Sequence, residues 1–333
     1  MAKRRKKVKS SSNYLSYIVW ILSFIVAISA SLAVGYHFGY NDAKTHTNLE
    51  QKNKENINLA ILQKFEKNNA KTENKSVNDR LKEVLKQAPK NAISANHEYE
   101  EESLAKPPVR IKRDLALSST KPKLAIIFDD VSVKSQVEAI KKLNLPLTMS
   151  FLPPSKYRPN SAKLASKEDF YMVHLPMEAM GFTKEEPFTL RIADSQSEIR
   201  DRVEKIKKLF PRVRYINNHT GSKFTSSEIA VNKLISILNE NHINFIDSRT
   251  TADTKVPKVM KNFDLKYVSR DVFLDHQLDK LYIKKQIKKA IKIAKAHGTA
   301  IAIGHPHVNT LLAIDESKKL FEDVELVLIN KLY

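Results

Sequence analysis

Short apolar runs of strand length alternate with stretches of helical spacing through residues 121–333. Strands of a buried parallel sheet have such continuous Val, Ile and Leu runs because helices cover both faces of the sheet. The apolar runs lie at 124–128, 147–152, 170–174, 215–216, 245–247, 266–269, 299–304 and 324–329. Helical spacing is found up to residue 143, over 196–209, over 225–238, over 278–296 and in a closing helix. This alternation predicts βαβ units and a parallel sheet.

The number of strands indicates the architecture of this domain. The domain is therefore predicted to have an α/β fold. Seven or eight strands within 121–333 favour a distorted (β/α) barrel of about seven strands over an open doubly wound sheet. Thr225 and Glu228 have the spacing of a capping box, which predicts a helix start at Thr225. The sequence has no G-x-G-x-x-G and no G-x-x-x-x-G-K-[ST] motif, so nucleotide binding has no support.

The N-terminal part of the chain has a different pattern. Residues 15–36 contain no charge and are rich in Ile, Val, Leu and Ala, which is long enough to cross a bilayer as a helix. We therefore expect a transmembrane signal anchor over 15–38, with a cleaved signal peptide as the alternative. The basic tip at 1–14 predicts a cytoplasmic N-terminus and a periplasmic or otherwise extracytoplasmic position for the remainder.

Residues 39–120 are predicted to form a polar spacer. They are rich in Lys, Asn and Glu, and two weak apolar stripes with helical spacing do not sustain a coiled coil. With few aromatic side chains the segment has too little apolar surface for a core of its own. We expect it to be partly helical or disordered and to separate the domain at 121–333 from the membrane.

Charge and cysteine content narrow the function classes. The formal net charge is +20, but the basic residues are dispersed, and the predicted topology removes the domain from the cytoplasm, so we expect no nucleic-acid partner. A basic surface also suits anionic glycans or membranes. The chain has no cysteine, which excludes disulfides and thiolate metal ligands. Any metal must therefore be bound by His, Asp or Glu.

Polar side chains with catalytic or ligating chemistry occur where the apolar runs end. The positions are Asp129 with Asp130, His174, His219, Asp247 with Arg249, and His305 with His307. In a barrel the carboxyl ends of the strands meet at one rim, so these residues are expected to converge. Adjacent residues of a strand face opposite sides, so Asp129 and Asp130 are expected to take different roles. The alternatives are that an Asp caps the next helix and that a single His is structural.

Six short motifs occur in order along the domain: FDD at 128–130, HLPME at 174–178, NNHTGS at 217–222, DSRTT at 247–251, RDVFLDH at 270–276 and GHPH at 304–307. Together they resemble the divergent polysaccharide deacetylase family, a distant branch of the carbohydrate esterases with the NodB-type fold. The resemblance covers 121–333 and implies a divalent metal, with zinc as the expected ion. It also implies that Asp129 is the general base, Asp130 a metal ligand and His305 the general acid.

The sequence departs from ordinary members of that superfamily where the metal is bound. They use a His-x-x-x-His pair, which is absent here, and Glu178 stands where the second His would be. We expect Asp130, His174 and His219 to be the ligands, with Glu178 as a substitute.

Other candidates have two interpretations each. Arg249 could orient a carboxylate or pair structurally with Asp247 or Asp271. Asp271, Asp275 and His276 could surround the site or cap loops, and His307 could be an outer partner of the site.

The resemblance implies a metal-dependent deacetylase that acts on an N-acetylated or O-acetylated cell-envelope polysaccharide, and the N-terminal sequence predicts that this domain is anchored to the membrane. Two alternatives stay open. One is a glycan-binding or scaffolding protein on the same fold, which would tolerate loss of Asp129 and His305. The other is a different hydrolase working through Asp129 and Glu178, which would need no metal.

Overall fold

The computed structural model describes residues 18, 20, 22, 121–181 and 184–333. Within these described residues, no helix has both the length and the apolar character needed to cross a membrane. The basic tip at 1–14, nearly all of the anchor predicted over 15–38 and the spacer predicted over 39–120 lie outside the described residues. Those three predictions therefore stay predictions.

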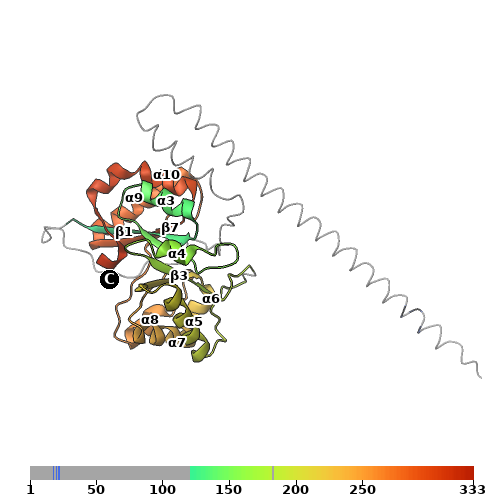
Figure 1. Ribbon diagram of the computed structural model, residues 1–333. Helices are drawn as coiled ribbons and strands as arrows, with labels where there is room; N and C mark the ends of the chain where they lie inside the picture. The colour runs from blue at the N-terminus through green and yellow to red at the C-terminus, as the bar shows by residue number, and fades with distance from the viewer. Residues whose placement is uncertain (1–17, 19, 21, 23–120, 182–183) are drawn as a thin grey trace, which may run out of the picture. The chain divides into compact units, whose positions relative to one another are not determined.

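Eight parallel strands form one curved sheet (Figure 1). The strands are β1 (Lys123–Val131), β2 (Thr148–Phe151), β3 (Met172–Met177), β4 (Tyr215–Thr220), β5 (Asn244–Ile246), β6 (Val272–Phe273), β7 (Thr299–Gly304) and β8 (Glu325–Leu326). Their order is β5-β4-β3-β2-β1-β7-β6, and β8 pairs with β1 beside this path. This order is that of a (β/α) barrel, and the sheet forms a parallel half-barrel, which confirms the predicted α/β class.

The two ends of the sheet approach each other at a single bridge. Asp247, directly after β5, pairs with Ser269 through backbone hydrogen bonds of 3.0 Å on either side. The strand predicted over 266–269 is thus wrong, because this segment makes only that isolated bridge. The strand lies further on, at β6, which pairs with β7. The strand predicted over 324–329 is also shorter, since only Glu325–Leu326 pairs with β1.

Helices cover the outside of the sheet. They are α3 (Lys134–Lys142), α4 (Ser161–Ala165), α5 (Gln196–Leu209), α6 (Ser222–Ser226), α7 (Glu228–Glu240), α8 (Val256–Asn262), α9 (Lys280–His297) and α10 (Val308–Asp315), followed by the 3-10 turns η1 (Lys318–Asp323) and η2 (Ile329–Lys331). In Figure 1, α3, α9 and α10 gather around β1 and β7, and α5, α7 and α8 gather on the side of β3. The helix predicted over 196–209 is confirmed.

The capping box predicted at Thr225 is wrong. Thr225 lies inside the short helix α6, where its hydroxyl donates to the Gly221 carbonyl at 2.8 Å. The N-cap of α7 is Ser227, whose side chain accepts from the Ala230 backbone N–H. The error arises because three successive hydroxyl residues offer the same capping chemistry.

The alternation of side chains along the strands separates two apolar layers. On β1, Leu124, Ile126 and Phe128 belong to the outer core under the helices. Ala125 and Ile127 point the other way and pack in a smaller inner cluster with residues such as Met172, Ile246, Ile301 and Ile303. The last residues of the chain contribute to this inner cluster through Val327 and Ile329. One end of the barrel interior is therefore filled by apolar side chains.

Candidate metal centre and active site

Polar side chains continue the inward-facing rows beyond the apolar layer. On β1 the row Ala125 and Ile127 is continued by Asp129, and on β3 the row begun by Met172 is continued by His174. His174 was expected at the end of its apolar run, but β3 extends to Met177 because it pairs with β4 over that length. Both polar side chains are almost fully buried. The interior thus changes from apolar to ionisable along each strand.

Regular strand geometry predicts that Asp129 and Asp130 face opposite sides of the sheet, and this prediction is wrong. Asp130 has a left-handed backbone with φ 59°, and the pairing of β1 with β2 shifts register between Phe128 and Val131. A bulge of this kind re-aims a side chain. Consequently both carboxylates approach the same imidazole: His174 Nδ1 lies 3.6 Å from Asp129 Oδ2, and His174 Nε2 lies 3.5 Å from Asp130 Oδ1.

Asp130, His174 and His219 form a compact group of ligand atoms. One atom of each residue lies within 4.8 Å of the others, and all three side chains are buried. His219 Nδ1 is 3.1 Å from Asp130 Oδ1, and the two imidazole rings have centroids 5.0 Å apart. Two imidazole nitrogens and a carboxylate oxygen are a common ligand set of catalytic zinc, which leaves a coordination position for water. The residues present therefore fit the metal that the sequence led us to expect.

Asn217 connects the proposed base, Asp129, with the proposed metal ligand His174, and no sequence pattern predicts that role. Its Nδ2 donates to both oxygens of Asp129 at 2.9 Å, and its Oδ1 accepts from the Ser150 hydroxyl at 2.6 Å. His174 Nδ1 lies 3.1 Å from the same Oδ1. Because the carboxylate can only accept, the amide orientation is fixed, and His174 Nδ1 must be the donor. His174 Nε2 then has the lone pair on the side of Asp130, as a metal ligand requires.

The protonation of His174 agrees with this assignment. Burial lowers the pKa of His174 well below its usual value, and the nearby imidazole of His219 lowers it further. The opposing effect of Asp130 is smaller. His174 is therefore neutral at physiological pH, and a neutral imidazole is the form that binds metal.

His305 is oriented by a buried carboxylate. Its Nδ1 lies 3.0 Å from Asp275 Oδ1, and its backbone N–H donates to Asp275 Oδ2 at 2.7 Å. Thr310 also donates to Oδ2, at 2.6 Å. Burial acts to raise the pKa of Asp275, but the charges and hydrogen bonds of His305, His307 and Thr310 outweigh it and lower the pKa to about 2. With Nδ1 engaged by this anion, proton exchange by His305 goes through Nε2.

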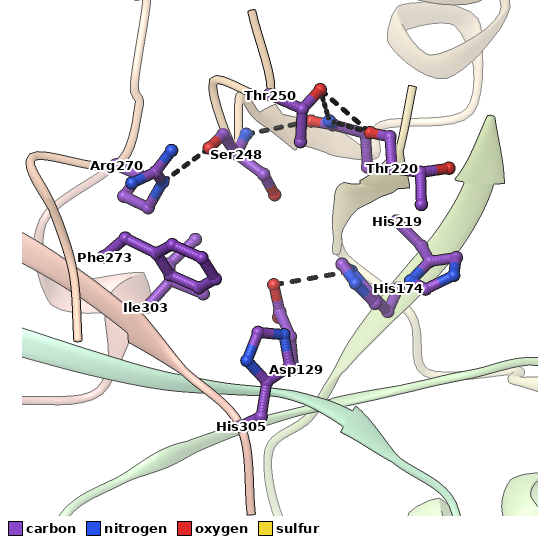
Figure 2. A pocket seen from close by; sticks show the side chains of 11 residues that line it. Asp129, His174, His219, Thr220, Ser248, Thr250, Arg270, Phe273, Ile303 and His305 are labelled. Atoms are coloured by element: carbon purple, nitrogen blue, oxygen red, sulfur yellow. Dashed lines mark hydrogen bonds and ion pairs between the residues drawn. The ribbon is translucent and has the colours of Figure 1, made fainter. Parts of the chain in front are cut away.

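Asp129, His174, His219 and His305 line one small cavity of ≈ 40 Å³ (Figure 2). In the figure the Asp129 carboxylate lies between the rings of His305 and His174. The remaining walls combine hydroxyl, cationic and apolar groups, namely Asn218, Thr220, Ser248, Thr250, Arg270, Phe273 and Ile303. Arg270 and Phe273 belong to the RDVFLDH motif but were not singled out from the sequence.

The other predicted residues have structural contacts. Glu178 accepts from Lys223 Nζ at 2.7 Å and from the Ile192 backbone at 2.9 Å, and it is not part of the ligand group. Burial acts to raise the pKa of Glu178, but these donors outweigh it and lower the pKa. The Arg249 backbone N–H donates to Asp247 at 2.8 Å.

Asp271 and His307 lie near the other half of the site. Asp271 accepts from the Ile301 backbone at 2.8 Å, which ties the start of β6 to β7. The His307 ring lies 5.7 Å from the ring of His305. His307 has a possible ligand atom within 4.8 Å of one in His305, which lines the cavity, and of one in Asp275.

The fold and the site define an α/β domain whose parallel half-barrel carries a buried cluster of carboxylates and imidazoles at one end. The chain belongs to the divergent polysaccharide deacetylase family, whose family model matches residues 126–333. This confirms the resemblance of the six motifs.

Two relatives are similar to this chain in sequence, and one solved structure is similar to it in fold. An uncharacterized protein of Haemophilus influenzae is 31% identical over 66% of this chain and 79% of its own length. The uncharacterized protein YibQ of Escherichia coli is 31% identical over 66% of this chain and 70% of its own. The crystal structure of the uncharacterized protein ATU2773 from Agrobacterium tumefaciens covers 65% of this chain and 90% of its own, with a TM-score of 0.56 at 18% identity. That similarity supports the fold.

Proposed function

We propose that the domain is a metal-dependent deacetylase that removes acetyl groups from an acetylated amino sugar of a cell-envelope polysaccharide. The observation that carries this proposal is one cavity that brings Asp129 and His305 beside the ligand group of Asp130, His174 and His219. Membership of the divergent polysaccharide deacetylase family supports the substrate class.

Asp130, His174 and His219 would hold a divalent metal, with zinc as the ion that suits two imidazoles and a carboxylate. Such a metal polarises a carbonyl and lowers the pKa of bound water. Asn217 supports this arrangement from behind, because it fixes the ring of His174 through Oδ1.

The proton transfers are assigned to residues on both sides of the cavity. Asp129 takes a proton from the attacking water, and His305 gives a proton through Nε2 to the departing amine nitrogen. Asn217 Nδ2 holds both oxygens of Asp129, and Asp275 holds Nδ1 of His305, so each group is oriented by a residue behind it. The products are acetate and a free amino sugar.

The proposed location follows from the N-terminal sequence. A basic tip at 1–14 followed by an uncharged segment within 15–38 supports an anchored protein with its N-terminus in the cytoplasm and its domain outside. The polysaccharide of the cell envelope would then be accessible to the domain.

Acetate release tests this function. Full-length protein in mild detergent would be incubated with zinc and with N-acetylated chitooligosaccharides or peptidoglycan fragments. Wild type should release acetate, and Asp129→Asn should reduce the rate by about 10²-fold or more, the usual contribution of a general base. His276→Ala, outside the cavity lining, is the control. Absence of acetate from all substrates, with zinc bound, would refute the activity and leave a glycan-binding domain.

A further inference from the structure

A second group of possible metal ligands lies beside the first. Asp275, His305 and His307 each offer a ligand atom, and these atoms lie within 4.8 Å of one another. Asp275 and His305 are buried, and His307 is partly exposed. The proposed chemistry uses Asp275 and His305 as a pair, but it has no role for His307.

The local chain conformation brings the two imidazoles together. The His307 backbone N–H donates to the His305 carbonyl at 2.7 Å, which closes a three-residue turn around Pro306. The fixed φ of proline suits the centre of such a turn. This turn brings the rings of His305 and His307 close together, with centroids 5.7 Å apart.

Gly304 lets the third ligand approach. A Cβ at this position would lie 3.2 Å from the Leu274 Cβ and 3.3 Å from Thr310 Cγ2, closer than ordinary contacts, and it would touch Asp275 Oδ2 at 3.4 Å. The end of β7 can therefore pack tightly against the segment that carries Asp275. The same sequence motif, GHPH, thus supplies both imidazoles and the space for the carboxylate.

We propose that Asp275, His305 and His307 form a second site for a divalent transition metal such as Zn²⁺, weaker than the first, and that its occupation blocks deacetylation. Two imidazole nitrogens and one carboxylate oxygen are the same ligand types as in the first group. The blocking effect rests on the proposed function, because a His305 ring that binds the ion through Nδ1 holds its one remaining proton on Nε2 and cannot give it to the departing amine. The binding of metal does not rest on it.

The contacts already made by these residues explain why the second site is weaker. The ion takes the place of the proton between His305 Nδ1 and Asp275 Oδ1, and in the neutral ring that proton moves to Nε2, so binding costs the His305–Asp275 hydrogen bond. Asp275 Oδ2 meanwhile keeps its bonds from the His305 backbone and Thr310. The partial exposure of His307 gives the ion a route from solvent.

Metal stoichiometry tests the site directly. Full-length protein would be titrated with Zn²⁺ by equilibrium dialysis, and we expect one tight and one weaker equivalent. His307→Ala should lose the weaker equivalent and keep the tight one. His174→Ala/His219→Ala should do the reverse. His307 is chosen over Asp275 because its side chain does not cap α10, whereas Asp275 anchors three donors.

His276→Ala is the matched control, since this nearby histidine is not part of the group, and it should keep both equivalents. A single equivalent in the wild-type protein would overturn the proposal. A second equivalent that persists in His307→Ala, or that is lost in His276→Ala, would overturn it as well.

The blocking effect is tested by measuring the rate of acetate release as the zinc concentration is raised. The rate of each protein is expressed relative to that protein's own highest rate. Wild type should be most active at one equivalent and lose activity as the second binds, whereas His307→Ala should show no such fall. An equal fall in both would overturn the blocking effect. If the second equivalent depends on His307 but no variant releases acetate, the site stands and the deacetylase proposal fails.

Discussion

Replacing Asn217 tests whether one buried amide holds the metal ligand and the base together. In Asn217→Leu, Asp129 loses a charge-assisted hydrogen bond worth about 1.5–3 kcal/mol, and His174 Nδ1 loses its acceptor at a cost of about 1–3 kcal/mol. We therefore expect a loss of about 2.5–6 kcal/mol in the free energy of unfolding. Zinc affinity should fall by about 10- to 100-fold, as for other residues that orient a metal-binding imidazole.

Asn217→Asp separates the two contacts of the amide. The aspartate keeps an acceptor for His174 but replaces the donor by a carboxylate beside Asp129, and two such carboxylates share one proton. We expect zinc affinity within about threefold of wild type, because the hydrogen bond that orients the metal-binding ring of His174 is kept. Acetate release should fall by about 10²-fold or more, because Asp129 no longer acts as an independent base.

The matched control is the neighbouring residue. Asn218 is equally buried, but it bonds to Thr220, Thr250 and the Ser248 backbone instead of Asp129 and His174. Asn218→Leu should therefore lower stability without a comparable loss of zinc affinity. Zinc affinity is measured by competition with a chromogenic chelator, and stability by denaturant unfolding. Wild-type zinc affinity in folded Asn217→Leu would refute the argument and indicate that Asp129, 3.6 Å away, orients His174 alone.

Three further predictions concern residues around the site. The pKa of Asp275 is lowered to about 2 in the folded protein, from a usual value of 3.8. The ionised carboxylate therefore stabilises the fold by about 2 kcal/mol above pH 3.8, and this stabilisation is lost as the pH falls towards 2. Denaturant unfolding in chelator from pH 5 to 2 should show a shallower loss for Asp275→Asn than for wild type, and parallel curves would contradict this. Glu178→Gln should retain the tight zinc equivalent in elemental analysis, because Glu178 pairs with Lys223 outside the ligand group; loss of that equivalent would restore Glu178 as a ligand. Gly221→Ala should cost about 1–3 kcal/mol in thermal unfolding, since Gly221 has φ +96° and an added Cβ would lie 2.9 Å from the Met177 Cβ; an unchanged melting temperature would count against this.

The sequence predicted the ligand group because its members carry a strong local signal. Asp130, His174 and His219 are ionisable side chains beside apolar runs, and the parallel order of strands brings such positions together. The same reasoning failed for the direction of the Asp130 side chain. Its left-handed backbone depends on the bulge against β2, and no pattern of residue types indicated that bulge.

Residues that act through tertiary contacts were harder to recognise. Asn217 has no charge, and its importance arises only from contacts with Asp129 and Ser150, which are 88 and 67 residues away in the sequence. Asp275 was considered as a neighbour of the site, but its pairing with His305 depends on the packing of β7. Strand β6 has two residues, too few for a periodic pattern to identify.

The metal content of the full-length protein tests the central claim most directly. Wild type and His174→Ala/His219→Ala would be purified with zinc present, passed through gel filtration and analysed for metal, with His276→Ala as the control. We predict close to one tightly bound zinc per chain in wild type and control, and none at this site in the double variant. Wild-type protein that retains no metal after zinc-replete preparation would contradict the metal-dependent mechanism, and the cavity would then be interpreted as a binding site.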